Sequence, residues 1–100
     1  PTIRFHNGFY YLFYLSKPYS KYVTLVARSN DLTIWTHSNQ AVLAPDDKLG
    51  EGENNSDMDL IEHEGRTKII YAFGSQTTHW SDLRWAEYKG PIGQFLEGFF

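Results

Sequence analysis

Amide and carboxylate side chains crowd into one short stretch of the sequence, residues 54–60. Asn55, Asp57 and Asp59 stand there, at the start of an apolar run that we expect to form a strand over 58–62. Asp and Asn are poor strand formers, so packing alone does not explain them. A carboxylate that faces a pocket can transfer protons, and an amide can bind the hydroxyl groups of a sugar. We therefore interpret Asp57 as a residue that points into a sugar-binding pocket.

Asp57 would need a partner to do glycosidase chemistry. Glycoside hydrolysis uses two carboxyl groups on opposite sides of the scissile bond, one to protonate the leaving oxygen and one to activate water or attack. Asp57 and Asp59 are two positions apart, so on a strand they share a face and cannot flank a sugar from both sides. The stretch therefore predicts one catalytic carboxylate, Asp57. A structural alternative stays open, in which Asp57 accepts hydrogen bonds from backbone amides in a turn.

Strand direction brings a second segment to the same place. We expect a strand over 67–73 to run antiparallel to 58–62, so that the loop after it returns to the rim beside Asp57. This loop offers an amide for hydroxyl groups and an indole for stacking on a sugar face. By strand alternation we expect the Arg4 side chain to face the same pocket and to pair there with a carboxylate. The candidate substrate-binding residues are Asn55, Asp59, Arg4, Gln76, His79 and Trp80. For each of them an ordinary turn or surface role is the alternative.

The elements that position these residues are predicted to be strands. The expected strands are 2–5, 9–15, 22–29, a weaker one in 35–43, and then 58–62, 67–73 and 83–88. Asn7-Gly8 and Glu64-Gly65 predict tight turns. The strand 9–15 is apolar on both faces, so we expect it between two sheets. An aromatic fraction of 17% also favours an all-β fold.

The pattern of strands occurs twice. Gly8 aligns with Gly65 at an offset of 57 residues, which also places 12–14 on 69–71. The segment 92–95 then corresponds to the turn at 32–35. A repeat of three or four strands is typical of a β-propeller blade. We expect one blade-like unit over 1–50 and a second, truncated one over 51–100. A propeller has at least about four blades, so we interpret the chain as a fragment.

Three segments, 1–15, 29–35 and 56–60, together resemble the five-bladed propeller glycoside hydrolases of family 43, which include arabinanases, xylosidases and arabinofuranosidases, with fructosidases as cousins. The resemblance spans most of the chain and is carried by the order and spacing of the motifs. It implies a poly- or oligosaccharide substrate and three acidic groups from different blades, one of them Asp57. Met58 stands where the family commonly has Pro, and Glu51-Gly52-Glu53 lies further from the strand than the family's acid motif.

The same resemblance implies an enzyme in the full-length parent, with the isolated chain inactive and the remaining blades of the propeller as its partners. It implies no obligatory cofactor, although a hydrated calcium ion in the channel would be compatible, and it suggests a secreted or periplasmic protein. A non-catalytic propeller that binds carbohydrate or protein is the main alternative. A self-contained small β domain is another. Asp57-Met58-Asp59 also matches the metal-holding motif of glycosyltransferases, but no nucleotide-binding βαβ pattern accompanies it.

Charge and composition exclude several other classes. Net charge is −3, with +2 in residues 1–50 and −5 in residues 51–100, which disfavours nucleic acid as a partner. The chain contains no Cys, so disulfides and thiolate metal sites are excluded. His6, His37 and His63 lack the spacing of metal ligands. No apolar run is long enough to span a membrane.

Overall fold

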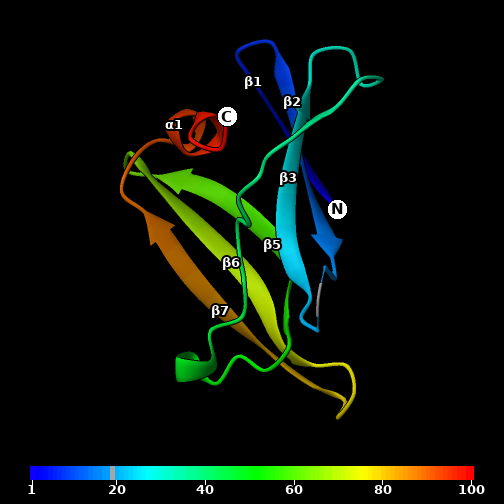
Figure 1. Cartoon of the computed structure of the whole chain (residues 1–100). Helices are drawn as coiled ribbons and strands as arrows, with labels where there is room; N and C mark the ends of the chain where they lie inside the picture. The colour runs from blue at the N-terminus through cyan, green and yellow to red at the C-terminus, as the bar shows by residue number, and fades with distance from the viewer. Residues whose placement is uncertain (19) are drawn as a thin grey trace.

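Two antiparallel sheets make up most of the computed structural model, which describes residues 1–18 and 20–100. The first sheet contains, in spatial order, β1 (Thr2–His6), β2 (Phe9–Ser16), β3 (Val23–Ser29) and β4 (Thr36–His37). The second contains β5 (Asn54–His63), β6 (Arg66–Ser75) and β7 (Trp80–Tyr88). A 3-10 turn, η1 (Asp47–Leu49), and a helix, α1 (Ile92–Glu97), complete the fold (Figure 1). The predicted all-β class is confirmed.

Both predicted hairpin turns are present. Asn7 and Gly8 have φ of 50° and 85°, and Glu64 and Gly65 have φ of 53° and 74°. Two-residue hairpin loops of the favoured type need positive φ at both central positions, which Asn and Gly adopt most readily. These turns fix the antiparallel registers of β1 with β2 and of β5 with β6.

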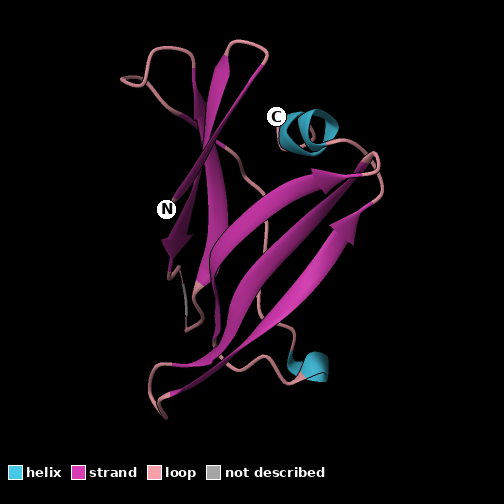
Figure 2. Ribbon diagram, turned by 180° about the vertical axis from the view of Figure 1, so that it is seen from behind, coloured by secondary structure: helices cyan, strands magenta, loops and turns pink. Residues whose placement is uncertain are grey.

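The core lies between the inner faces of the two sheets, and α1 covers one end of it (Figure 2). Along β2, β5 and β6 buried side chains alternate with more exposed ones, so one set of each of these strands points inward. The buried cluster consists of Tyr11, Phe13, Val26, Met58, Leu60, Ile69, Tyr71, Phe95 and Leu96. Because β2 buries Tyr11 and Phe13 while Tyr10 and Leu12 remain half-buried on its other face, the expected sandwich exists on one side of this strand.

Two segments differ from their predicted structure. The weak strand expected over 35–43 is reduced to the two residues of β4, followed by a single bridge between Leu43 and Thr24. Ser38, Asn39 and Gln40 interrupt it, because their side chains favour turns over strand pairing. The segment expected as a turn over 92–95 is helix α1. Its residues Ile92, Phe95 and Leu96 recur at helical spacing, which puts them on one face.

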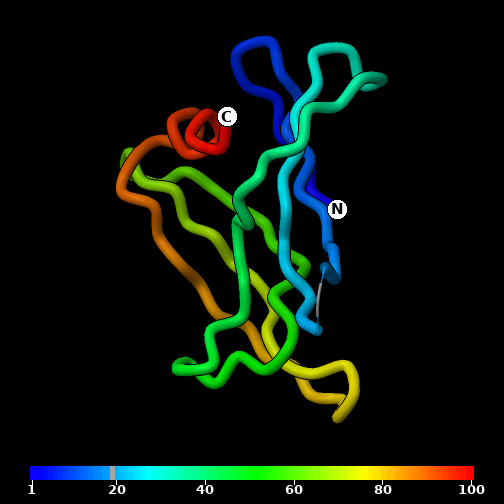
Figure 3. The backbone as a smooth tube through the Cα atoms, viewed as in Figure 1, coloured from blue at the N-terminus to red at the C-terminus, as the bar shows by residue number. Residues whose placement is uncertain are grey.

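A long connection, residues 38–53, carries the chain from the first sheet to the far end of the second (Figure 3). It contains η1, which Asp46 caps by accepting a 2.8 Å hydrogen bond from the Lys48 amide. Gly50 ends this turn in the left-handed region with φ of 66°. The connection therefore delivers Glu51 and Glu53 to the end of β6. In the part of the chain that the structure describes, no helix is long and apolar enough to cross a membrane.

Candidate functional site

Asp57 lies at an irregularity of β5. This strand begins at Asn54, four residues before the predicted start, and its register with β6 shifts between Ser56 and Asp59. Asp57 has φ of 52°, a left-handed conformation that Asp adopts more readily than most residues. Such bulges redirect a side chain and are common beside functional sites. The bulge leaves Asp57 exposed while Met58 stays in the core.

A pocket of about 280 Å³ opens beside Asp57. Asn54, Ser56, Asp57, Gln76, His79 and Trp80 contribute to its lining. The antiparallel pairings of Asn54 with Gly74 and of Ser75 with Trp80 explain how the start of β5 meets the loop between β6 and β7. Four residues singled out in the sequence, the carboxylate Asp57 and three residues at the turn from β6 into β7, thus share one pocket. Their roles there stay predictions.

Glu53 holds the loop that forms one wall of this pocket. Its Oε1 accepts hydrogen bonds from the Thr77 amide at 3.2 Å and from the hydroxyl groups of Ser75 and Thr77, both at 2.9 Å. These bonds, the one from the Thr77 amide first, lower the pKa of the Glu53 carboxyl. Glu53 is therefore a positioning residue. Its signal in the sequence is only indirect, an acidic residue just before a strand.

Trp80 lines the pocket and rests on a tightly packed base. Its ring meets the ring of Phe73 edge to face at 5.9 Å, and 43% of the residue is exposed. Gly52 lies beneath it, where a Cβ would be 3.2 Å from the Trp80 ring and would overlap the Gly74 carbonyl oxygen. The fixed, partly exposed indole suits stacking on an apolar ligand face.

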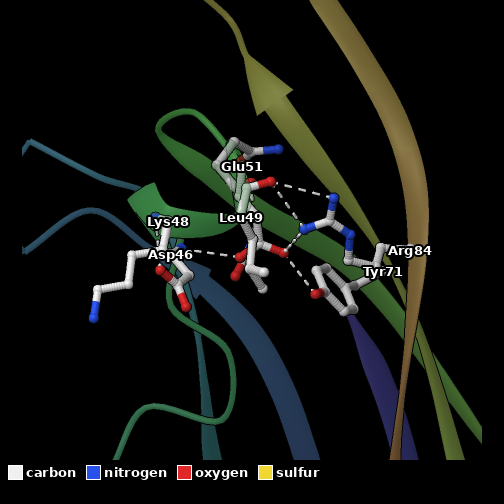
Figure 4. A network of polar contacts seen from close by, with 8 residues as sticks. Asp46, Lys48, Leu49, Glu51, Tyr71 and Arg84 are labelled. Carbon is white, nitrogen blue, oxygen red and sulfur yellow. Dashed lines mark hydrogen bonds and ion pairs between the residues drawn. The ribbon is translucent and has the colours of Figure 1, made fainter.

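A buried carboxylate, Glu51, lies outside the pocket lining and binds groups from three segments (Figure 4). It is 2% exposed. Its Oε2 accepts the Tyr71 hydroxyl at 2.6 Å and Arg84 Nη1 at 3.0 Å, and its Oε1 accepts the Asp46 amide at 2.9 Å. Burial raises the pKa of Glu51, but the bonds from Tyr71, Asp46 and Arg84 outweigh it and leave the pKa below its ordinary value. Burial and the neighbouring Glu51 carboxylate raise the pKa of Tyr71 to about 12.

Arg84 extends this cluster across the second sheet. It donates to the Leu49 carbonyl oxygen at 3.3 Å, and its guanidinium lies 4.3 Å from the centre of the Phe73 ring. The cluster therefore joins the 38–53 connection to β6 and β7. Because each Glu51 oxygen already accepts hydrogen bonds, we interpret Glu51 as a structural anchor between the connection and the second sheet.

Three of the predicted substrate-binding residues lie elsewhere. Asn55 is 1% exposed and donates from Nδ2 to the Asn54 carbonyl oxygen at 3.0 Å, so Asn54, its neighbour, lines the pocket instead. Arg4 forms an ion pair with Asp59 and also donates to the Leu60 carbonyl oxygen at 3.2 Å. This pair borders a separate groove of about 540 Å³ beside β5 and β6. The predicted pairing of Arg4 with a carboxylate thus exists, away from Asp57.

Residues 1–18 and 20–100 contain no group of three or more His, Cys, Asp or Glu side chains arranged to hold a metal ion. Comparisons of the chain with protein-family models, with curated proteins and with solved structures returned no match.

Proposed function

We propose that this chain forms one wall of a carbohydrate-binding pocket in a propeller glycoside hydrolase that cleaves poly- or oligosaccharides. The observation that carries the proposal is the convergence of Asp57, Gln76, His79 and Trp80 on one pocket. A carboxylate, an amide and an exposed indole are the groups that sugar recognition uses, since a sugar ring has hydroxyl edges and an apolar face.

The size of the pocket supports the same conclusion. Small-molecule pockets begin at about 300 Å³, so a pocket of about 280 Å³ suits a single sugar unit of a longer chain. Trp80 would stack on the ring, and Gln76 would bind its hydroxyl groups. Asp57 would serve as one of the carboxylates that transfer a proton, tune the acid or activate water.

The second carboxylate would come from other blades of the same propeller. Asp59 is paired with Arg4, Glu53 is bound to the loop and Glu51 is buried, so Asp57 is the exposed carboxylate that this chain brings to the pocket. This single carboxylate also favours a second candidate, a propeller that binds carbohydrate without cleaving it.

Asp57→Asn separates the two candidates, with Asp59→Asn as the matched control at the neighbouring groove. We would measure arabino- and xylo-oligosaccharide binding from the change in tryptophan fluorescence that Trp80→Phe abolishes, and hydrolysis in the assembled propeller. A glycosidase predicts that Asp57→Asn abolishes hydrolysis or shifts its pH profile while binding persists. Binding without hydrolysis in the wild type supports the second candidate. Absence of both activities in the wild type rejects the proposal.

A further inference from the structure

The outer face of the second sheet exposes four large apolar side chains. They lie on one side of β5, β6 and β7 and are 49% to 69% exposed: Ile61, Ile70, Leu83 and Trp85. A continuous apolar face of this kind marks a surface that another protein covers. The charges beside it are already paired, since Glu87 binds Arg66 at 2.8 Å and Lys68 at 3.1 Å. A partner with an apolar, uncharged face would therefore match this surface.

The outer face of the first sheet has the same character. Among the described outward positions of β1, β2 and β3 there is no Asp, Glu, Lys or Arg. Ile3 and Phe5 are 48% and 63% exposed on this face, and Leu12 and Tyr14 line an apolar pocket of about 220 Å³ beside them. The protein thus carries two uncharged apolar faces, one on each side of its core.

The strands of the two sheets pair in equivalent registers. Ile3 lies opposite Leu12 in the first sheet, as Leu60 lies opposite Ile69 in the second. The offset of 57 residues that aligns the two hairpin glycines also relates Ile3 to Leu60 and Leu12 to Ile69. Ile3 is exposed, whereas Leu60 and Ile69 are buried in the core. This row of side chains therefore points outward in the first sheet and inward in the second.

The neighbouring row points the opposite way in each sheet. Phe13 and Val26 lie opposite each other in the first sheet and are buried against the second. Their equivalents, Ile70 and Trp85, lie opposite each other in the second sheet and face outward. The contact inside the chain thus joins two unlike faces, and the two exposed faces are the structural equivalents of those that it joins.

We propose that a second copy of this chain covers the exposed face, with the outer face of its first sheet packed on the outer face of the second sheet. The expected contacts join Ile70 and Trp85 of one copy to Ile3 and Leu12 of the next. They repeat the contact that already holds the two sheets together within the chain. A contact between two different surfaces adds copies head to tail until a ring closes. The inference does not require the pocket to bind a sugar.

Analytical ultracentrifugation of the 100-residue chain tests this association. The wild type should show a mass above the 11.6 kDa of the monomer, rising with protein concentration. Trp85→Glu introduces a charge into one face and Ile3→Glu into the other, and each variant alone should remain a monomer because an unpaired charge would be buried. Leu49→Glu, at an exposed residue of η1 outside both faces, is the matched control and should associate as the wild type does.

An equimolar mixture of the two face variants tests the head-to-tail arrangement. The intact first-sheet face of Trp85→Glu can pack on the intact second-sheet face of Ile3→Glu, and the other two faces of that pair are both blocked. The mixture should therefore form a complex of twice the monomer mass and grow no further. Circular dichroism establishes that each variant is folded. Leu83→Glu, at the most exposed of the four apolar residues, replaces Trp85→Glu should that variant not fold.

Two results would overturn the inference. A wild type that stays monomeric up to about 1 mM protein rejects a second copy as the partner of these faces. A face variant that still dimerises alone, or a mixture that forms no complex, rejects the head-to-tail contact and indicates that like faces pack on each other. Neither result bears on sugar binding, which the Asp57 variant tests separately.

Discussion

Tyr71 donates a 2.6 Å hydrogen bond to Glu51, and this contact joins the middle of β6 to the connection that precedes β5. Glu51 is 2% exposed, so its charge depends on Tyr71, Arg84 and the Asp46 amide for compensation. Removing one partner of a buried charged group leaves the others unsatisfied, which costs more than the bond itself contributes. The stability of the contact between the 38–53 connection and the second sheet should therefore depend on these few residues.

Glu51→Ala should destabilise the protein by about 2 to 3 kcal/mol, because Arg84 and the Tyr71 hydroxyl both lose their acceptor. Tyr71→Phe should cost only about 1 kcal/mol, since Arg84 and the Asp46 amide still hold the carboxylate. Urea unfolding followed by circular dichroism measures both changes. Equal losses in the two variants would contradict the view that Glu51 is the centre of the cluster.

Acid should weaken the same cluster. The hydrogen bonds to Glu51 hold its folded pKa below the ordinary value of 4.5, despite the opposing effect of burial. A carboxyl with a lowered pKa contributes stability above its unfolded pKa and loses it as pH falls through the folded pKa. The free energy of unfolding should thus decline below about pH 4.5, and Glu51→Gln should decline less steeply. If the free energy of unfolding falls equally with pH in the wild type and in Glu51→Gln, other carboxyl groups dominate the loss of stability in acid.

Alkali should act through Tyr71. Its pKa rises from 10.0 to about 12 in the folded protein, so the folded state keeps a proton that the unfolded state releases. The stability from this group is complete below pH 10 and is lost as pH rises towards 12. Tyrosinate absorbance and unfolding free energy, measured between these limits, should show a late-titrating Tyr in the wild type. Tyr71→Phe should lack it, whereas a control Tyr10→Phe should retain it.

Glu53→Ala should loosen the 75–80 loop without greatly lowering the melting temperature, because Glu53 bonds to this loop and lies outside the core. Hydrogen exchange at the Thr77 amide should become faster, since that amide loses its acceptor. Glu53→Gln keeps an acceptor oxygen and should restore part of the protection. Unchanged exchange in Glu53→Ala would show that the loop is held by its other contacts.

The sequence predicted the elements better than the placement of side chains. Alternation and the Asn7-Gly8 and Glu64-Gly65 turns identified the main hairpins, because both signals are local. Helix α1 was missed because three apolar residues in a six-residue segment fit a turn as well as a helix.

The candidate site was likewise predicted better in its strands and loop than in the placement of its side chains. Antiparallel direction was enough to bring the 75–80 loop to Asp57. The bulge at Asp57 could not be foreseen, since it depends on the register of β5 with β6. It is also why Asn54, rather than Asn55, lines the pocket. Glu51 and Glu53 were missed because their partners are distant in sequence, so only the folded chain reveals them.

The packing under Trp80 can be tested with two glycines that share a conformation but not a neighbourhood. Gly52 and Gly65 have φ of 72° and 74°, so Ala is strained to a similar degree at both. A Cβ at Gly65 meets nothing within 4 Å, whereas a Cβ at Gly52 overlaps the Gly74 carbonyl oxygen. Gly65→Ala should cost about 1 kcal/mol, and Gly52→Ala should cost a further 1 to 3, roughly the penalty of overpacking.

Urea unfolding of both variants gives this difference directly, and the part of the tryptophan fluorescence that Trp80→Phe removes reports whether the indole moves. A larger effect at Gly52 with a shifted Trp80 spectrum indicates that the close approach of the two backbones holds the Trp80 ring in place. Equal losses at the two positions would mean that the backbone at Gly52 relaxes at little cost, and the fixed position of Trp80 would then need another cause.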